Sequence, residues 1–205
     1  MLVRRHSFSI EEPWTLPGGC EAQPLWSAVD GAAPRLSTSV AAYHDGRVLY
    51  VWFSAADDDV VATLRGHDEP LWQEDVLEIF IAPRSVTEYF EVEVNPIGTT
   101  FDARIESPDG TRETMRVFLD WEWRAMDALV RRDWLADGRS HLLTLLRLPF
   151  AGVGEAPVSG ERWRANFLRV DRSTDHGDEY SAWSPTLRSP ADFHVSAALG
   201  TLRFE

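Results

Sequence analysis

The chain has 205 residues, of which 44% are hydrophobic and 11% aromatic, as is typical of a globular domain with a sizeable core. Its 33 acidic and 20 basic residues give a formal net charge of -13, which would repel a nucleic-acid backbone or an anionic membrane. We therefore expect neither nucleic acid nor a membrane as a partner.

The chain is predicted to form one domain over residues 1–205, because no repeat or low-complexity linker divides it. Residues 1–23 are expected to form an extended N-terminal arm. Glu11, Glu12 and Pro13 interrupt the apolar run that a secretory signal needs, and the lone Cys20 suits a reducing compartment. We expect a cytoplasmic protein, or a secreted one if a signal has been removed.

Short apolar or alternating runs separated by turn residues recur along the chain, whereas helical periodicity is scarce. This rhythm predicts an all-β fold, an antiparallel β-sandwich of jelly-roll or immunoglobulin-like type with little helix. The clearest predicted strands span residues 48–55, 75–82, 89–95, 99–106, 119–125, 141–148 and 162–170. Turns rich in Asp, Asn, Pro and Gly are predicted at residues 44–46, 95–98, 108–110 and 136–138.

Side-chain alternation in the second of these strands separates Val76, Glu78 and Phe80 from a set that we assign to the core. That set is Asp75, Leu77, Ile79 and Ile81. If this strand pairs with the next as a hairpin through residues 83–88, Glu78 shares a sheet surface with Glu91 and Glu93. A solvated outer sheet face is the alternative, since it alternates in the same way.

Three carboxylates need cationic partners, and the pattern offers two candidates. Arg104 shares a face with Asp102 on the third strand, and Arg169 alternates away from an apolar pair. A polyhydroxylated ligand suits such a mixed surface, because each sugar hydroxyl both donates and accepts hydrogen bonds. Trp72 and Trp183 lie at a strand margin or in a loop, where their rings could stack on a sugar or line the rim of the core.

Four stretches together resemble carbohydrate-binding module family 9 and its family-9-like domains, which are related to the DOMON sandwich superfamily. These stretches are LWQEDVLEIFI (71–81), YFEVEVNPIGTTFDAR (89–104), GERWRANFLRVDR (160–172), and YSAWSPT (180–186) with the closing ALGTLRFE (198–205). Residues 24–30 and 48–57 also resemble the first strands of that family, so the similarity covers nearly the whole chain.

The resemblance implies a jelly-roll-like sandwich with a sugar site on one concave sheet, where two Trp clamp a terminal sugar. It places Trp72 on the first clamp position and Glu78 on the carboxylate that follows. Glu91 and Glu93 stand where better-known members have Arg and Asn, and Arg169 stands where an amide is expected. Residues 186–193 contain no second clamp, for which Trp183 is a substitute. Asp102 and Arg104 are expected to form an ion pair facing the pocket.

The predicted function is non-catalytic binding of a mono- or disaccharide, or of a chain end. The predicted ligand-binding residues are Trp72, Glu78, Glu91, Glu93, Arg104, Arg169 and Trp183. Two alternatives stay open: a glycoside-active enzyme that uses a Glu pair, and a protein-interaction module. The sequence does not indicate an oligomeric state.

No cofactor is predicted. The six His show no close ligand pair for zinc, and Met115 and Met126 are assigned to the core or its edge rather than to haem. Structural calcium is an option at the acidic loops 57–59 and 175–179, for which solvated turns are the favoured interpretation.

Overall fold

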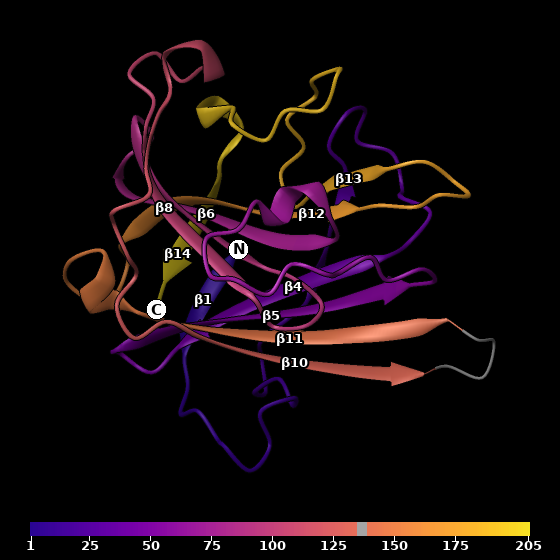
Figure 1. Cartoon of the computed structure of the whole chain (residues 1–205). Coiled ribbons are helices and arrows are strands. Elements are labelled where there is room, and N and C mark those ends of the chain that lie inside the picture. The colour runs from indigo at the N-terminus through magenta and orange to yellow at the C-terminus, as the bar shows by residue number, and fades with distance from the viewer. Residues whose placement is uncertain (135–138) are drawn as a thin grey trace.

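In the computed structural model, which describes residues 1–134 and 139–205, every regular element is a β-strand or a single turn of 3-10 helix (Figure 1). The turn predicted at residues 136–138 lies outside the described residues. None of the described helices is long and apolar enough to cross a membrane. The 3-10 turns are η1 (Leu71–Gln73), η2 (Arg112–Thr114), η3 (Phe150–Gly152) and η4 (Ser196–Ala198).

The strands form two layers, which lie one above the other in Figure 1. Sheet A contains β3 (Trp26–Ser27), β6 (Val76–Ser85), β7 (Glu88–Val94), β8 (Thr100–Glu106), β9 (Arg116–Phe118), β12 (Arg162–Asp171), β13 (Glu179–Ala182) and β14 (Gly200–Phe204). Sheet B contains β2 (Gln23–Pro24), β4 (Thr38–His44), β5 (Val48–Asp57), β10 (Asp127–Trp134) and β11 (Ser140–Pro149). The pairing within both layers is antiparallel, which confirms the predicted all-β sandwich.

Strand β1 (Leu2–Arg5) links the two layers. Leu2 and Val3 pair in parallel with β14, and Arg4 and Arg5 pair in parallel with β4. The chain that follows packs on the outer face of sheet B, where Phe8 stacks on Tyr50 at a ring-centroid distance of 4.8 Å.

The main core lies between the layers and is built by strand alternation. The side chains of β6 that were assigned to the core, such as Ile79, meet Phe53 of β5 and Phe167 of β12, and all three are fully buried. Phe53 and Phe167 make an edge-to-face contact with ring centroids 6.1 Å apart.

The outward face of sheet A is also buried. Phe80, Tyr89, Phe101 and Leu168 form a second apolar cluster on this face, to which Phe193 from a loop contributes. The idea of a solvated outer face is therefore wrong for sheet A. Because loops cover this face, they can enclose a cavity on it.

The strand predicted at residues 119–125 is wrong, since these residues form turns and irregular chain between β9 and β10. The alternating pattern arises because aromatic side chains of this segment pack against the core, not because the segment is a strand. Trp123 is buried, its indole Nε1 donates to the carbonyl of Pro149 at 2.8 Å, and Trp121 packs against Phe90. The segment anchors itself to the core by its tryptophans rather than by a strand ladder.

We expect Phe167→Ala to lower the free energy of unfolding by about 3–5 kcal/mol, because it opens a cavity in the middle of the main core. Denaturant unfolding measures the change. Val158→Ala is the control, since that side chain is 69% exposed and its loss should cost less than about 0.5 kcal/mol. A loss of unfolding free energy that is equally small in both variants would contradict the placement of Phe167 in the core.

Candidate functional site

Three glutamates meet on the outward face of sheet A because of the register of one hairpin. Glu78 of β6 lies opposite Glu93 of β7, and Phe80 lies opposite Glu91. Carboxylate oxygens of the three glutamates lie within 4.8 Å of one another. The glutamates are 3%, 6% and 0% exposed for Glu78, Glu91 and Glu93. The predicted shared surface of this triad is therefore confirmed.

The triad lies in the floor of a cavity of about 330 Å³, together with Phe101 and Val170. One wall comes from η2, β9 and the residues that follow, and carries Arg112, Met115, Val117 and Leu119. Another comes from the loop before β14 and carries Ala191, Phe193 and His194. Apart from the acids, the lining is thus largely apolar.

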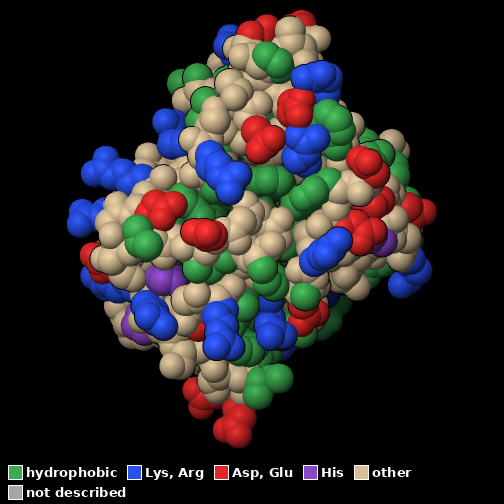
Figure 2. All heavy atoms as spheres, turned by 90° about the vertical axis from the view of Figure 1, so that its left-hand side faces the viewer, with side chains coloured by type: hydrophobic (Ala, Val, Ile, Leu, Met, Phe, Trp, Pro, Cys, Tyr) green, Lys and Arg blue, Asp and Glu red, His purple; other side chains and the backbone are tan. Residues whose placement is uncertain are grey.

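Segment 107–125, which supplies the first wall, runs along the left side of Figure 1, and Figure 2 turns this side toward the viewer. Hydrophobic side chains gather near the middle of that face between Arg and acidic groups. Val117 and Leu119 are 46% and 52% exposed, so hydrophobic surface continues from the cavity lining to solvent.

Trp72 supplies an open aromatic surface to the cavity. Its side chain is held by η1 and packs edge-to-face on Phe101, with centroids 5.5 Å apart, yet 44% of the residue remains exposed. Arg172 fixes the backbone beneath the ring by donating to the Trp72 carbonyl. A large aromatic ring held rigidly and left exposed is a typical surface for ligand stacking.

Arg112 and Arg172 line the same cavity, but each already has an acidic partner. Arg112 Nε lies 3.1 Å from Asp192 Oδ1, and Arg172 binds Asp178 and the hydroxyl of Tyr180. In the described part of the chain no donor reaches either oxygen of Glu93 within hydrogen-bonding distance. The two arginines thus favour ionisation of Glu78 by their charge, while their ion-pair partners are other acids.

Burial raises the pKa of all three triad acids, and their mutual repulsion adds to the effect for Glu78 and Glu93. The pKa of Glu91 rises to about 7. Glu93 partly offsets the rise in the pKa of Glu91, whereas Glu91 adds to the rise in the pKa of Glu93. All three triad acids therefore hold their protons to a higher pH than ordinary glutamates do.

His194 adds a neutral polar group to the cavity. Burial, with the nearby Arg112, lowers its pKa to about 4. Its ring stacks on Phe80, and its Nδ1 shares a 2.8 Å hydrogen bond with the hydroxyl of Tyr89. His194 therefore adds no positive charge to balance the triad at neutral pH.

Arg104 does not line the cavity, contrary to the prediction. It lies opposite Phe90 and binds Glu88 and Glu106, at 3.1 and 2.6 Å. The expected ion pair with Asp102 is not formed, because Asp102 accepts the backbone N–H of Trp123. On β8 the residue opposite Glu93 is Phe101, so Arg104 points to the other face.

Arg169 also lies elsewhere, because it points between the layers. Its guanidinium donates to Thr38 and to the carbonyl of Ala56, and binds Asp57 and Asp171. At 4% exposure it is a buried structural link between sheet A and sheet B. Trp183 is likewise remote from the cavity, since its indole Nε1 donates to Gln23 and its ring packs on Phe167.

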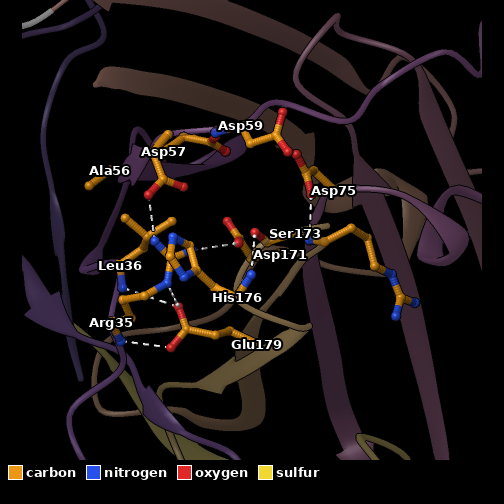
Figure 3. A network of polar contacts seen from close by, with 12 residues as sticks. Arg35, Leu36, Ala56, Asp57, Asp59, Asp75, Asp171, Ser173, His176 and Glu179 are labelled. Atoms are coloured by element: carbon orange, nitrogen blue, oxygen red, sulfur yellow. Dashed lines mark hydrogen bonds and ion pairs between the residues drawn. The ribbon is translucent and has the colours of Figure 1, made fainter. Parts of the chain in front are cut away.

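The two acidic loops singled out for calcium belong to the same polar network, part of which Figure 3 shows. Asp58 binds Arg35, and Glu179 accepts the backbone N–H groups of Arg35 and Leu36 at 2.7 and 3.2 Å. Asp171 lies 3.7 Å from Arg35. These acids already have partners in the described chain, and structural calcium there remains an untested option.

Sequence reasoning missed most of the cavity wall. Arg172 lies two residues beyond the predicted strand 162–170, so its place beside the sheet could have been noticed. Arg112, Phe193 and His194 come from loops far apart in the chain. Hydrophobic periodicity does not describe such loops, and no local signal in the sequence indicates them.

The sequence profile of carbohydrate-binding family 9 matches residues 22–204. The chain belongs to this family. A proposed carbohydrate-binding protein from Bacteroides uniformis has a similar structure, with a TM-score of 0.77 and 21% identity over 100% of this chain and 98% of the other. Two structures of a family 9 module from Caldicellulosiruptor kristjanssonii, in complex with glucose and with cellotriose, are similar at TM-scores of 0.63 and 0.62.

Both Caldicellulosiruptor structures are 12% identical to this chain and cover 100% of it, and 95% and 93% of their own chains are matched. No curated protein matches the sequence. At these identities the structural likeness establishes the shared fold of the family 9 domain.

The pKa shifts predict how stability depends on pH. An acid whose pKa is raised by folding stabilises the folded state while it is protonated, and this contribution is lost as the pH rises from its unfolded value through its folded value. For Glu91 that window runs from the ordinary value of 4.5 to about 7, and Asp75, raised to about 7 by burial, acts in the same direction. The melting temperature of the ligand-free domain should therefore fall between about pH 5 and about pH 8.

Glu93→Gln tests the source of this dependence. Removing one acid should flatten the profile and stabilise the domain at about pH 8, by something on the order of 1–3 kcal/mol. Glu155→Gln, at an exposed loop position, should leave the profile unchanged. A steeper profile in the Glu93 variant would contradict the assignment.

Proposed function

We propose that this family 9 domain binds a mono- or disaccharide, or the end of a longer chain, in the cavity above sheet A and does no chemistry on it. The observation that carries the proposal is one shared cavity for an exposed indole, Trp72, and three buried carboxyl groups. Sugars need this combination, because a ring presents an apolar face for stacking and hydroxyls at its edge.

Each side chain has a distinct role in this arrangement. The indole of Trp72 provides the stacking surface, and the triad accepts hydrogen bonds from hydroxyls. Arg112 and the Tyr180 hydroxyl lie at the same cavity and can donate to sugar oxygens. Arg104, Arg169 and Trp183 take no part, since they lie outside the cavity.

The size of the cavity supports a small ligand or a chain end. About 330 Å³ lies near the lower limit of the range for small-molecule sites, roughly 300–1,000 Å³. The relatives solved with glucose and with cellotriose support a saccharide of this size, although their sequences differ widely from this one.

Binding rather than catalysis agrees with the family, which is one of carbohydrate-binding domains. A glycosidase needs two carboxyl groups with separate duties, one ionised and one protonated, roughly 5–9.5 Å apart across the scissile bond. The triad oxygens instead lie within 4.8 Å of one another, closer together than carboxyl groups that flank a scissile bond. Release of nitrophenol from aryl glycosides by the purified domain would contradict this proposal.

Trp72→Ala should weaken binding of glucose and cello-oligosaccharides at least about tenfold, because stacking on the indole is lost. Isothermal titration calorimetry measures the change. Trp26→Ala is the matched control, since Trp26 is similarly exposed, at 41%, but does not line the cavity. Equal affinities for the wild type and the Trp72 variant would show that the sugar does not bind in this cavity.

A further inference from the structure

The cavity floor gathers three buried carboxyl groups, and the two arginines beside them are already ion-paired with other acids. Glu93 is fully buried, lines the cavity, and receives no hydrogen bond from a nitrogen or hydroxyl donor at either oxygen. Arg112 and Arg172 are ion-paired with Asp192 and Asp178, and the lowered pKa of His194 leaves it without charge at neutral pH. Without a cationic partner, the triad acids hold protons or face water.

A bound ligand changes this balance. When a sugar fills the cavity and excludes water, any carboxylate left charged and unpaired is costly. A neutral sugar can donate hydroxyls to the triad but brings no charge. A ligand that carries a cation offsets the desolvation of the acids directly, and opposite charges attract strongly at low local dielectric.

The geometry favours an ammonium group as this cation. An ammonium has three N–H donors and no acceptor, which matches three separate carboxyl groups. With N–H···O distances of 2.7–2.9 Å, acceptors around a tetrahedral nitrogen lie about 4.6 Å apart. One oxygen of each triad acid lies within 4.8 Å of the others, so a single nitrogen can reach all three.

A bare metal ion suits the cavity less well. Calcium takes about six to eight oxygen ligands and magnesium keeps several waters. Beyond the triad, apolar groups line the cavity, namely Phe101, Val170, Leu119 and the Trp72 ring. These groups pack favourably against the carbon atoms of a ligand and offer no oxygen to a metal ion. An amine attached to a sugar ring supplies both the charge and the carbon skeleton.

We propose that the cavity selects an amino sugar, whose protonated amine is bound jointly by Glu78, Glu91 and Glu93. This inference rests on the proposed function, because it assumes that a sugar enters the cavity. It adds the chemical class of the preferred ligand: a cationic saccharide rather than a neutral one.

Calorimetry with the full chain at a pH where the amines are protonated tests this selection. The probes are glucose, glucosamine, and the sugar with an amine in place of the primary hydroxyl of glucose. Each amino sugar differs from glucose by one group of similar size. At least one should bind about tenfold or more tightly than glucose. N-acetylglucosamine, which has lost the charge, should gain no such advantage.

Glu93→Gln should reduce the ratio of amino-sugar to glucose affinity to near one, because the amide can still accept a hydrogen bond but carries no charge. Glu155→Gln should keep the wild-type ratio. Glu78→Gln serves the same purpose if the Glu93 variant does not fold. A Glu93 variant that keeps the full advantage would overturn the inference.

The remaining outcomes separate this inference from the proposed function. If glucose binds and no amino sugar binds more tightly, the sugar site stands and the ammonium inference fails. If none of the sugars binds, the proposed function fails and the inference falls with it. If magnesium or calcium chloride alone raises the melting temperature and Glu93→Gln removes the effect, a metal ion occupies the triad and the ammonium assignment is wrong.

Discussion

The site depends on one constraint, side-chain alternation within a sheet that is buried on both faces. Along β6 every second residue enters the core between the layers, as Ile79 does, and this fixes the opposite direction for Glu78. The hairpin register then brings Glu91 and Glu93 beside it. A slip of one residue would exchange the core side chains with the acids, so the apolar core holds the triad in place.

This arrangement separates the part of the domain that provides stability from the part that provides recognition. The cluster between the layers contains fully buried Phe53, Phe167 and Trp163, and supplies hydrophobic stabilisation. The outward face of sheet A carries acids that are costly to bury. The domain tolerates this cost because the buried acids can hold protons. The protonation of the triad can therefore change when a ligand enters the cavity.

The sequence correctly predicted features that depend on side-chain alternation within neighbouring strands. It failed for residues whose position depends on how the two sheets and the loops pack together. The triad lies on two strands joined by a short hairpin, so its common face could be predicted. Arg169 was misplaced because its apolar neighbours Leu168 and Val170 belong to the outward cluster, and not to the core between the layers. Arg112 and His194 come from loops whose paths depend on tertiary packing, which periodicity does not encode.

The linking strand β1 has a consequence for the order of folding. Leu2 pairs with Arg203, and the Met1 amine donates to the carbonyl of Thr201 at 2.7 Å, across about 200 positions of the chain. Contacts between such distant residues carry the largest loop-closure entropy and form late. The hairpin of β6 and β7 can form from nearby residues, whereas the seam between the layers must wait for β14. During synthesis the domain should therefore pass through a state with the triad hairpin formed and its sandwich still open.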